Sequence, residues 1–96
     1  MNGMGETEQK FWNLVEELIE AANQKASAQE PALVSDALLY AAARFNVYVA
    51  AAAAADRAEF KAELEEVKAL LLEQFAAMLD ANLDDYLENY KLYLER

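Results

Sequence analysis

The chain of 96 residues contains no cysteine and no histidine. Without cysteine there is no disulfide, no thiolate nucleophile and no cysteine-ligated zinc site, a composition that fits a reducing cytoplasm. Without histidine the chain lacks the commonest general base, the commonest metal ligand and every triad that uses imidazole. These absences favour a cytoplasmic protein that is not an enzyme, has no catalytic residues and uses no cofactor.

Residues that make turns are scarce as well. The chain has two glycines, both before Glu6, and a single proline, Pro31. β-Hairpins depend on such residues, so a sheet built from hairpins is excluded. A phosphate loop or a dinucleotide fingerprint is also excluded, because both need a glycine-rich segment. The sequence therefore predicts an all-α fold.

Basic residues are few, with 8 lysines and arginines against 18 acidic residues and a formal charge of -10. Such a chain repels a phosphate backbone unless its cations cluster, and these do not. We expect no nucleic-acid partner. The acidic residues are spread over every predicted helix, which is typical of solubilising charge rather than of a nucleic-acid mimic.

A membrane location is not expected either. Residues 1–10 have no basic n-region and no apolar h-region, so no secretory signal is predicted. The long apolar run at 37–55 is rich in alanine and carries Arg44 at its centre. That arginine would cost about 2.5 to 3.5 kcal/mol in a bilayer. The run is better interpreted as a helix buried in protein.

Apolar residues recur at three- and four-residue spacing in four segments, which predicts a compact bundle of about four helices. We expect residues 1–6 to be a disordered lead-in and residues 7–96 to be one helical domain. Pro31 suits the first turn of the second helix, because its missing N–H would be unpaired there. The helices are expected at approximately 7–26, 31–55, 57–80 and 83–94.

Two further boundaries follow from capping residues. Asp56 with Glu59 three residues later resembles a capping box at the start of the third helix. Beyond Met78 the apolar stripe rotates by roughly 100°, which indicates a bend or break near Ala81 and Asn82. Asn82 would then cap the fourth helix, with Asp84 and its neighbour in the first turn, where negative charge is favourable.

Arg44 is the main candidate for a polar site. Its helical neighbours at three and four residues are Tyr40, Ala41, Val47 and Tyr48, so no local carboxylate can neutralise it. We expect it to form a largely buried pair with Asp84 or Asp85, with Asp84 as first choice, because a guanidinium binds a carboxylate bidentately. Asn46 would complete this network or bond the backbone. The alternative is that Arg44 snorkels to solvent between the two tyrosine rings.

The same residues allow a second interpretation. Arg44, Asn46 and the carboxylates of Asp84 and Asp85, together with Tyr40, Tyr48 and Tyr86, could surround a pocket for a small molecule or a metal. Asp80, Asn82 and Asp84 match the first three ligand positions of an EF-hand loop. The sixth-position glycine and the final glutamate are missing, however, so a metal site is not predicted there.

Three separated motifs resemble a family of small bacterial proteins of unknown function: "FWNLVEELIEAAN" at 11–23, "LLYAAARFNVYVAAAA" at 38–53 and "MLDANLDDYLENY" at 78–90. The resemblance implies a bacterial, soluble, helical protein and brings no catalytic residues. The residues that map to it are Arg44, Phe45, Asn46, Asp84, Asp85 and Tyr86.

The function expected from these observations is association. Helix 31–55 is apolar around most of its circumference, and three other short helices leave part of it uncovered. We expect a protein that forms a homodimer or binds a protein partner, with the alanine face near residues 50–54 at a two-fold interface. Binding of a small molecule or metal through Arg44, Asn46 and Asp84 or Asp85 is the alternative.

Overall fold

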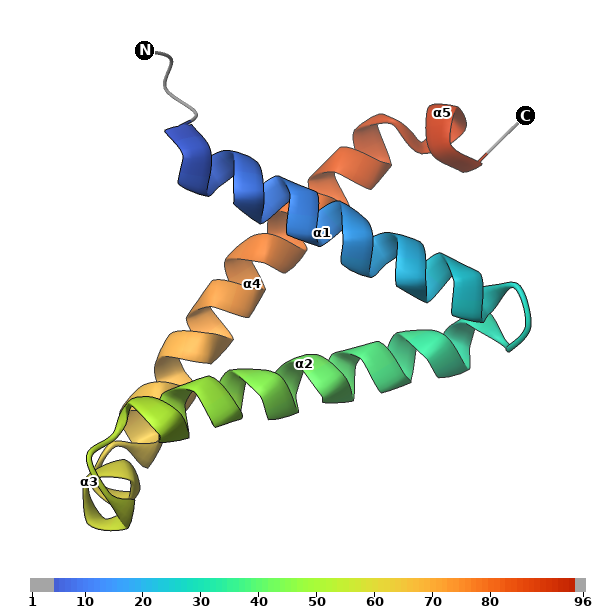
Figure 1. The fold of residues 1–96 in the computed structure, drawn as a ribbon. Helices are drawn as coiled ribbons and strands as arrows, with labels where there is room; N and C mark the ends of the chain where they lie inside the picture. Colours follow the sequence, from blue (N-terminus) through green and yellow to red (C-terminus); the bar gives the residue numbers. More distant parts are fainter. Residues whose placement is uncertain (1–4, 95–96) are drawn as a thin grey trace. The chain divides into compact units, whose positions relative to one another are not determined.

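The computed structural model describes residues 5–94, and these residues form helices and short turns with no strand. The all-α prediction is confirmed. Residues 1–4 of the predicted lead-in lie outside the described residues, and the first helix begins at Gly5. The five helices are α1 (Gly5–Ala26), α2 (Pro31–Ala53), α3 (Arg57–Ala62), α4 (Leu64–Glu88) and α5 (Tyr90–Leu94), as Figure 1 shows.

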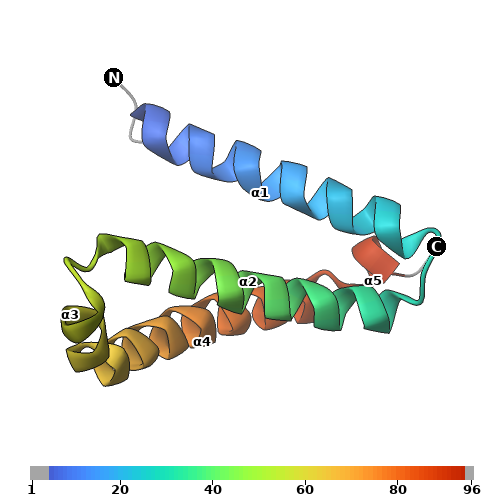
Figure 2. The same cartoon turned by 60° about the horizontal axis from the view of Figure 1, so that its bottom comes forward.

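The chain divides into two units, Met1–Phe45 and Asn46–Arg96. In the first unit a short turn joins α1 to the first half of α2. Both helices extend from that turn to the same side, so the chain runs along them in opposite directions (Figure 2). The Ser27 hydroxyl donates to the Gln24 carbonyl oxygen over 2.7 Å, where α1 ends. The Val34 N–H donates to the Glu30 carbonyl oxygen over 3.1 Å. Pro31 therefore occupies the first position of α2, as its missing donor predicts.

In the second unit, the end of α2 passes through α3 into α4. Asp56 is the N-cap of α3, and its carboxylate accepts the Glu59 N–H over 2.9 Å. Glu59 returns a bond of 2.8 Å, from the Ala55 N–H to its own carboxylate. This is a capping box shifted by one residue, because the returned bond goes to the residue before the cap. The predicted cap at Asp56 is confirmed.

The predicted break near Ala81 and Asn82 is wrong. Helix α4 runs without interruption from Leu64 to Glu88, so the predicted helices 57–80 and 83–94 are divided differently in the structure. The Asn82 side chain does not cap a helix, because its amide donates to the Met78 carbonyl oxygen one turn earlier, over 2.8 Å. A polar side chain satisfied in this way continues a helix that alanines already favour.

The interruptions lie instead at Glu63 and Asn89. Glu63 separates α3 from α4 with φ -101 and ψ 2, and Asn89 separates α4 from α5 with φ -112 and ψ 26. In both residues φ and ψ depart from the α-helical values. The rotation of the apolar stripe past Met78 is therefore a change of face along one helix.

No residue among 5–94 is fully buried. The side chains that are half-buried lie along the expected apolar stripes or near the turns. They are Val15, Ala22, Ala26 and Val34 in the first unit, and Ala50, Ala51, Ala54, Phe60, Glu63, Val67, Leu71 and Asn89 in the second. Larger apolar side chains remain exposed on every long helix. Each unit taken by itself thus lacks a closed hydrophobic core.

Candidate functional site

The residues expected at the polar site lie on two helices. Tyr40, Arg44, Asn46 and Tyr48 are on α2, and Asp84, Asp85 and Tyr86 are on α4. Arg44 belongs to the first unit, whereas both aspartates belong to the second. The pair between Arg44 and Asp84 or Asp85 therefore stays a prediction. What the structure brings together is a smaller cluster around Asp85, near the end of α4.

The two aspartates lie in a place that the sequence did not predict. Asp84 and Asp85 stand five and four residues before Asn89, near the C-terminus of α4, and not in the first turn of a helix. The helix dipole disfavours negative charge at a C-terminus, and α4 has no basic residue in its last turn. A carboxylate in this position gains from hydrogen-bond donors that offset the dipole.

The Asp85 carboxylate receives two such donors. The Asn89 amide donates to Asp85 Oδ1 over 2.9 Å, and the Tyr93 hydroxyl lies 3.1 Å from Oδ2 and 3.3 Å from Oδ1. The Asn89 amide also lies 3.1 Å from the Asp85 carbonyl oxygen, which accepts the Asn89 N–H over 3.0 Å as well. Asp85 thus contacts Tyr93 of α5 through its side chain, and it contacts Asn89, between the two helices, through its side chain and its backbone.

Tyrosine rings pack beside this carboxylate. The Tyr86 and Tyr93 ring centroids are 4.7 Å apart, with their planes tilted by 50°. The hydrogen bond that the Tyr93 hydroxyl donates to Asp85 raises the pKa of that hydroxyl above its ordinary value of 10.0. Partial desolvation, the charge of Asp85 and the nearby Tyr86 act in the same direction. The cluster therefore favours the protonated form of the Tyr93 hydroxyl.

The sequence marks Asp85 and Tyr86 as candidate site residues, but Asn89 and Tyr93 are not predicted from it as partners of Asp85. A signal for them exists, because Asp85, Asn89 and Tyr93 follow one another at intervals of four residues, which places each within reach of the next on a helix. The spacing alone does not show that Tyr93 bypasses Asn89 to reach the carboxylate. That contact needs the change of direction at Asn89.

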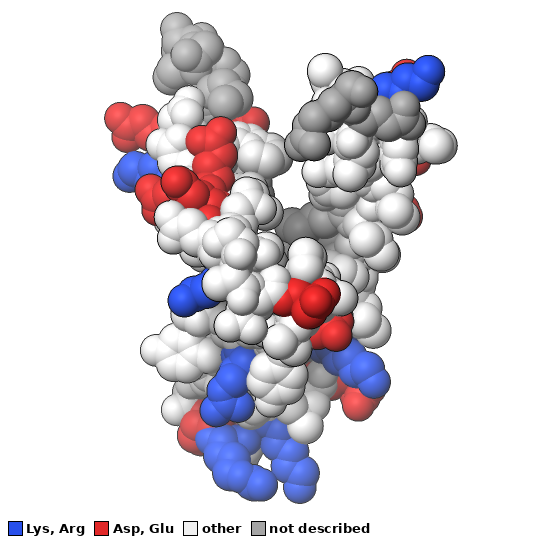
Figure 3. Space-filling view, turned by 90° about the vertical axis from the view of Figure 1, so that its right-hand side faces the viewer, with Lys and Arg blue, Asp and Glu red and all other residues white. Residues whose placement is uncertain are grey.

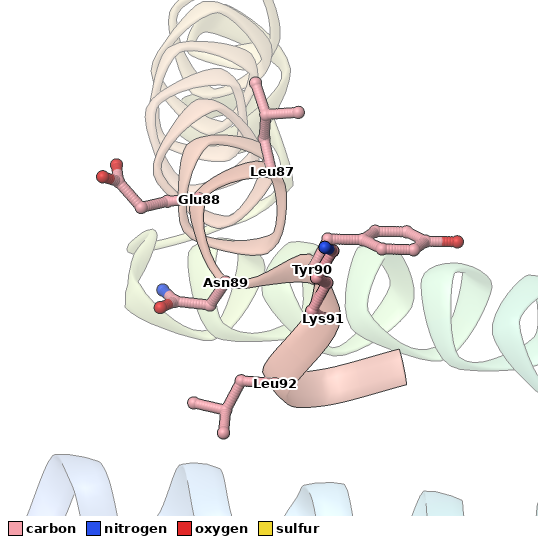
Figure 4. A pocket seen from close by; sticks show the side chains of 6 residues that line it. All are labelled: Leu87, Glu88, Asn89, Tyr90, Lys91 and Leu92. Carbon is pink, nitrogen blue, oxygen red and sulfur yellow. The ribbon is translucent and has the colours of Figure 1, made fainter. Parts of the chain in front are cut away.

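A pocket of about 400 Å³ lies at the junction of α4 and α5. Leu87, Glu88, Asn89, Tyr90, Lys91 and Leu92 line it, and Figure 4 shows their side chains pointing in several directions from one stretch of chain. Small-molecule sites bury most of their ligand between several elements. Six consecutive residues cannot enclose a ligand in this way, and none of the predicted site residues lines this pocket.

The charged groups give no metal centre in the part of the chain that the structure describes. Between residues 5 and 94, no three His, Cys, Asp or Glu side chains lie close enough together to hold a metal ion.

Over the same residues, no helix has both the length and the apolar character needed to cross a membrane. Uncharged side chains make up most of the face shown in Figure 3.

The hydrogen bond between Tyr93 and Asp85 predicts a distinct titration. A raised pKa in the folded state means that the bond contributes stability below the ordinary tyrosine pKa. That contribution is lost as the pH rises through the raised value. The ionisation of Tyr93 can be followed by NMR of the tyrosine rings over a pH series, with Tyr93→Phe used to assign its signals. We expect Tyr93 to ionise at a higher pH than an ordinary tyrosine. Asp85→Asn should lower the pKa of the Tyr93 hydroxyl, because the neighbouring negative charge is removed.

The matched control is Asp84→Asn, which removes the adjacent carboxylate and should leave the Tyr93 titration unchanged. A Tyr93 ring that ionises at the ordinary pH in the unmodified protein, or equal shifts in the two variants, would contradict the contact.

Comparison with protein families gives one match that covers most of the chain. A family model described as "Protein of unknown function (DUF3144)" matches residues 11–87. No curated protein and no solved structure matches the chain significantly. The matched range includes α2, α3, nearly all of α4 and the part of α1 from Phe11 onward, and it ends before Asn89. The chain therefore belongs to the DUF3144 family.

Proposed function

We propose that this protein is a non-enzymatic helical module that acts by associating with a second copy of itself. The observation that carries the proposal is the exposure of large apolar side chains on all three long helices, from 42% for Leu38 to 80% for Leu87. Because packing against another unit can only lower these values, each unit by itself exposes at least as much. Such faces are stable in water only when another helix covers them.

Helix α2 is the best supported contact surface. Between Pro31 and Ala53 it carries only two charged residues, Asp36 and Arg44. A helix that is apolar nearly all round is normally covered on several sides. Its last turns are a run of alanines, whose small side chains let another helix approach closely. An isologous contact through residues 50–54 would bring few charges together in a chain of net charge -10.

A reducing, cytoplasmic location and a bacterial source complete the proposal. The first is supported by the absence of cysteine. The second is supported by the resemblance of the three motifs to small bacterial proteins. Neither nucleic acid nor a cofactor has a part in the proposed function, because the chain is strongly acidic and lacks the residues that most cofactor sites use.

The proposal predicts a dimer in solution. Light scattering coupled to size exclusion at micromolar concentration should give about 21 kDa, twice the chain mass of 10.7 kDa. Val49→Glu places a charge on the exposed apolar face of α2 and should shift the mass to that of one chain. Leu14→Glu, an equally exposed position on α1, is the matched control and should leave the dimer intact.

Far-UV circular dichroism of both variants separates dissociation from unfolding. A mass near 10.7 kDa for the unmodified protein at all concentrations tested would reject self-association.

We also propose the pair between Arg44 and Asp84 or Asp85 as a polar network that becomes buried when the helix faces are covered. Support comes from the position of Arg44, which has no carboxylate three or four residues away on α2. Asn46 would complete the network or bond backbone, and Tyr40 and Tyr48 would flank it at one turn on either side. The pair would fix how apolar faces align, a role for which buried charges are known.

Unfolding in urea tests this network. Arg44→Ala should lower the free energy of unfolding by about 3 to 5 kcal/mol, because it strands a carboxylate away from water. Replacing Arg44 and its aspartate together by apolar residues should be nearly neutral. If Arg44→Ala lowers the free energy of unfolding by less than about 1 kcal/mol, as is typical of an exposed pair, the buried network is contradicted. Asp36→Ala, at the other charged position of α2, is the control.

A further inference from the structure

The C-terminal part of the chain changes direction at Asn89. Two side chains that precede this residue contact one side chain that follows it. Asp85 and Tyr86 come from the end of α4, and Tyr93 comes from α5. The Tyr93 hydroxyl lies 3.1 Å from Asp85 Oδ2, and the Tyr93 ring centroid lies 4.7 Å from that of Tyr86. We call this segment, residues 85–94, the elbow.

These contacts belong to the bent form alone. In a straight α-helix, residues seven apart are separated by about 10.5 Å along the axis, because each residue adds about 1.5 Å. Side chains of one helix all tilt toward its N-terminus, so two rings keep most of that separation. Tyr86 and Tyr93 are seven residues apart. Their ring distance of 4.7 Å therefore depends on the bend at Asn89.

The sequence itself favours a straight helix over the same residues. Leu79, Leu83, Tyr86, Tyr90 and Tyr93 follow one another at alternating intervals of four and three residues. This is the spacing of one apolar stripe on a continuous helix. Neither glycine nor proline stands between Leu64 and Leu94 to force a break. The bend thus rests on side-chain contacts and on the Asn89 backbone, and local propensity opposes it.

We propose that the elbow is a two-state element, bent when Asp85 holds Tyr93 and straight when that contact is released. In the bent form the rings of Tyr86 and Tyr93 pack on each other. In the straight form α4 and α5 merge, and both rings join the stripe that begins at Leu79. Anything that contacts the lengthened stripe favours the straight form, and anything that strengthens the bond to Asp85 favours the bent form. The inference stands whether or not the protein dimerises.

Spin labels measure the two states directly, and the chain has no cysteine of its own to be labelled. One label is placed before the elbow, at Lys68→Cys, and the other at its last residue, Leu94→Cys. Both positions are exposed. A straight helix separates these Cα atoms by about 39 Å. The full chain with these two labels alone should give a main distance clearly shorter than this. Adding Tyr93→Phe, which removes one oxygen atom, should move the main peak toward the longer distance, and Asp85→Ala should do the same.

The control is Asp80→Ala, which removes another exposed carboxylate of α4 and should leave the distance distribution unchanged. Tyr93→Phe keeps the ring and should retain the helical circular dichroism signal, so its result is independent of any unfolding caused by Asp85→Ala. The proposal is overturned if the doubly labelled chain already shows the straight distance. It is equally overturned if Tyr93→Phe leaves the short distance in place.

Discussion

The constraint on which this protein depends is the covering of apolar helix faces. Most helical stability in proteins comes from packing of the apolar face and not from helix propensity alone. None of the described residues is fully buried, although the long helices carry many large apolar side chains, leucine above all. Capping at Asp56 and the proline at Pro31 define where helices begin, but they contribute little against the cost of ordering the chain. In the proposed account, association with a second copy of the chain supplies the remainder.

This constraint explains the composition of α2. Its alanines give high helix propensity and a smooth surface, and its two charged residues are few enough to allow contact on several sides. By contrast, α1 carries its charges on one side and its apolar residues, such as Val15 and Ala22, on another. The difference suits α2 to contact on several sides and α1 to contact on one side. This composition supports the proposed function, association through helix surfaces.

The parts of the fold that could be predicted are those set by neighbouring residues. Pro31 at the first position of α2 and Asp56 as the cap of α3 depend on contacts within four residues, which the sequence displays. The end of α4 could not be predicted in this way. A rotating apolar stripe suggested a break near Asn82, but that amide bonds within its own helix. The actual break at Asn89 involves a contact from Asp85 to Tyr93, eight residues away, which no period reveals.

The candidate site shows the same difference between contacts within a short segment and contacts between distant segments. The sequence marks Asp85 and Tyr86 as candidate site residues, and their partners in the structure are Asn89 and Tyr93. Both partners are close in sequence, and the contacts of Tyr93 depend on the bend at Asn89. The partner expected from the sequence, Arg44, lies in the other unit, where only the arrangement of whole helices decides the contact. Helix periodicity predicts which residues share one face of a helix, but it does not predict which face of another helix packs against them.

The central claim is that association, rather than the core of a single chain, stabilises the folded state. The most direct test is the urea midpoint of unfolding, followed by circular dichroism over a hundredfold range of protein concentration. Because the folded dimer dissociates on unfolding, mass action predicts a midpoint that rises steadily with concentration. A midpoint that is the same at the lowest and the highest concentration would contradict the claim, since a chain that closes its own core unfolds independently of its neighbours.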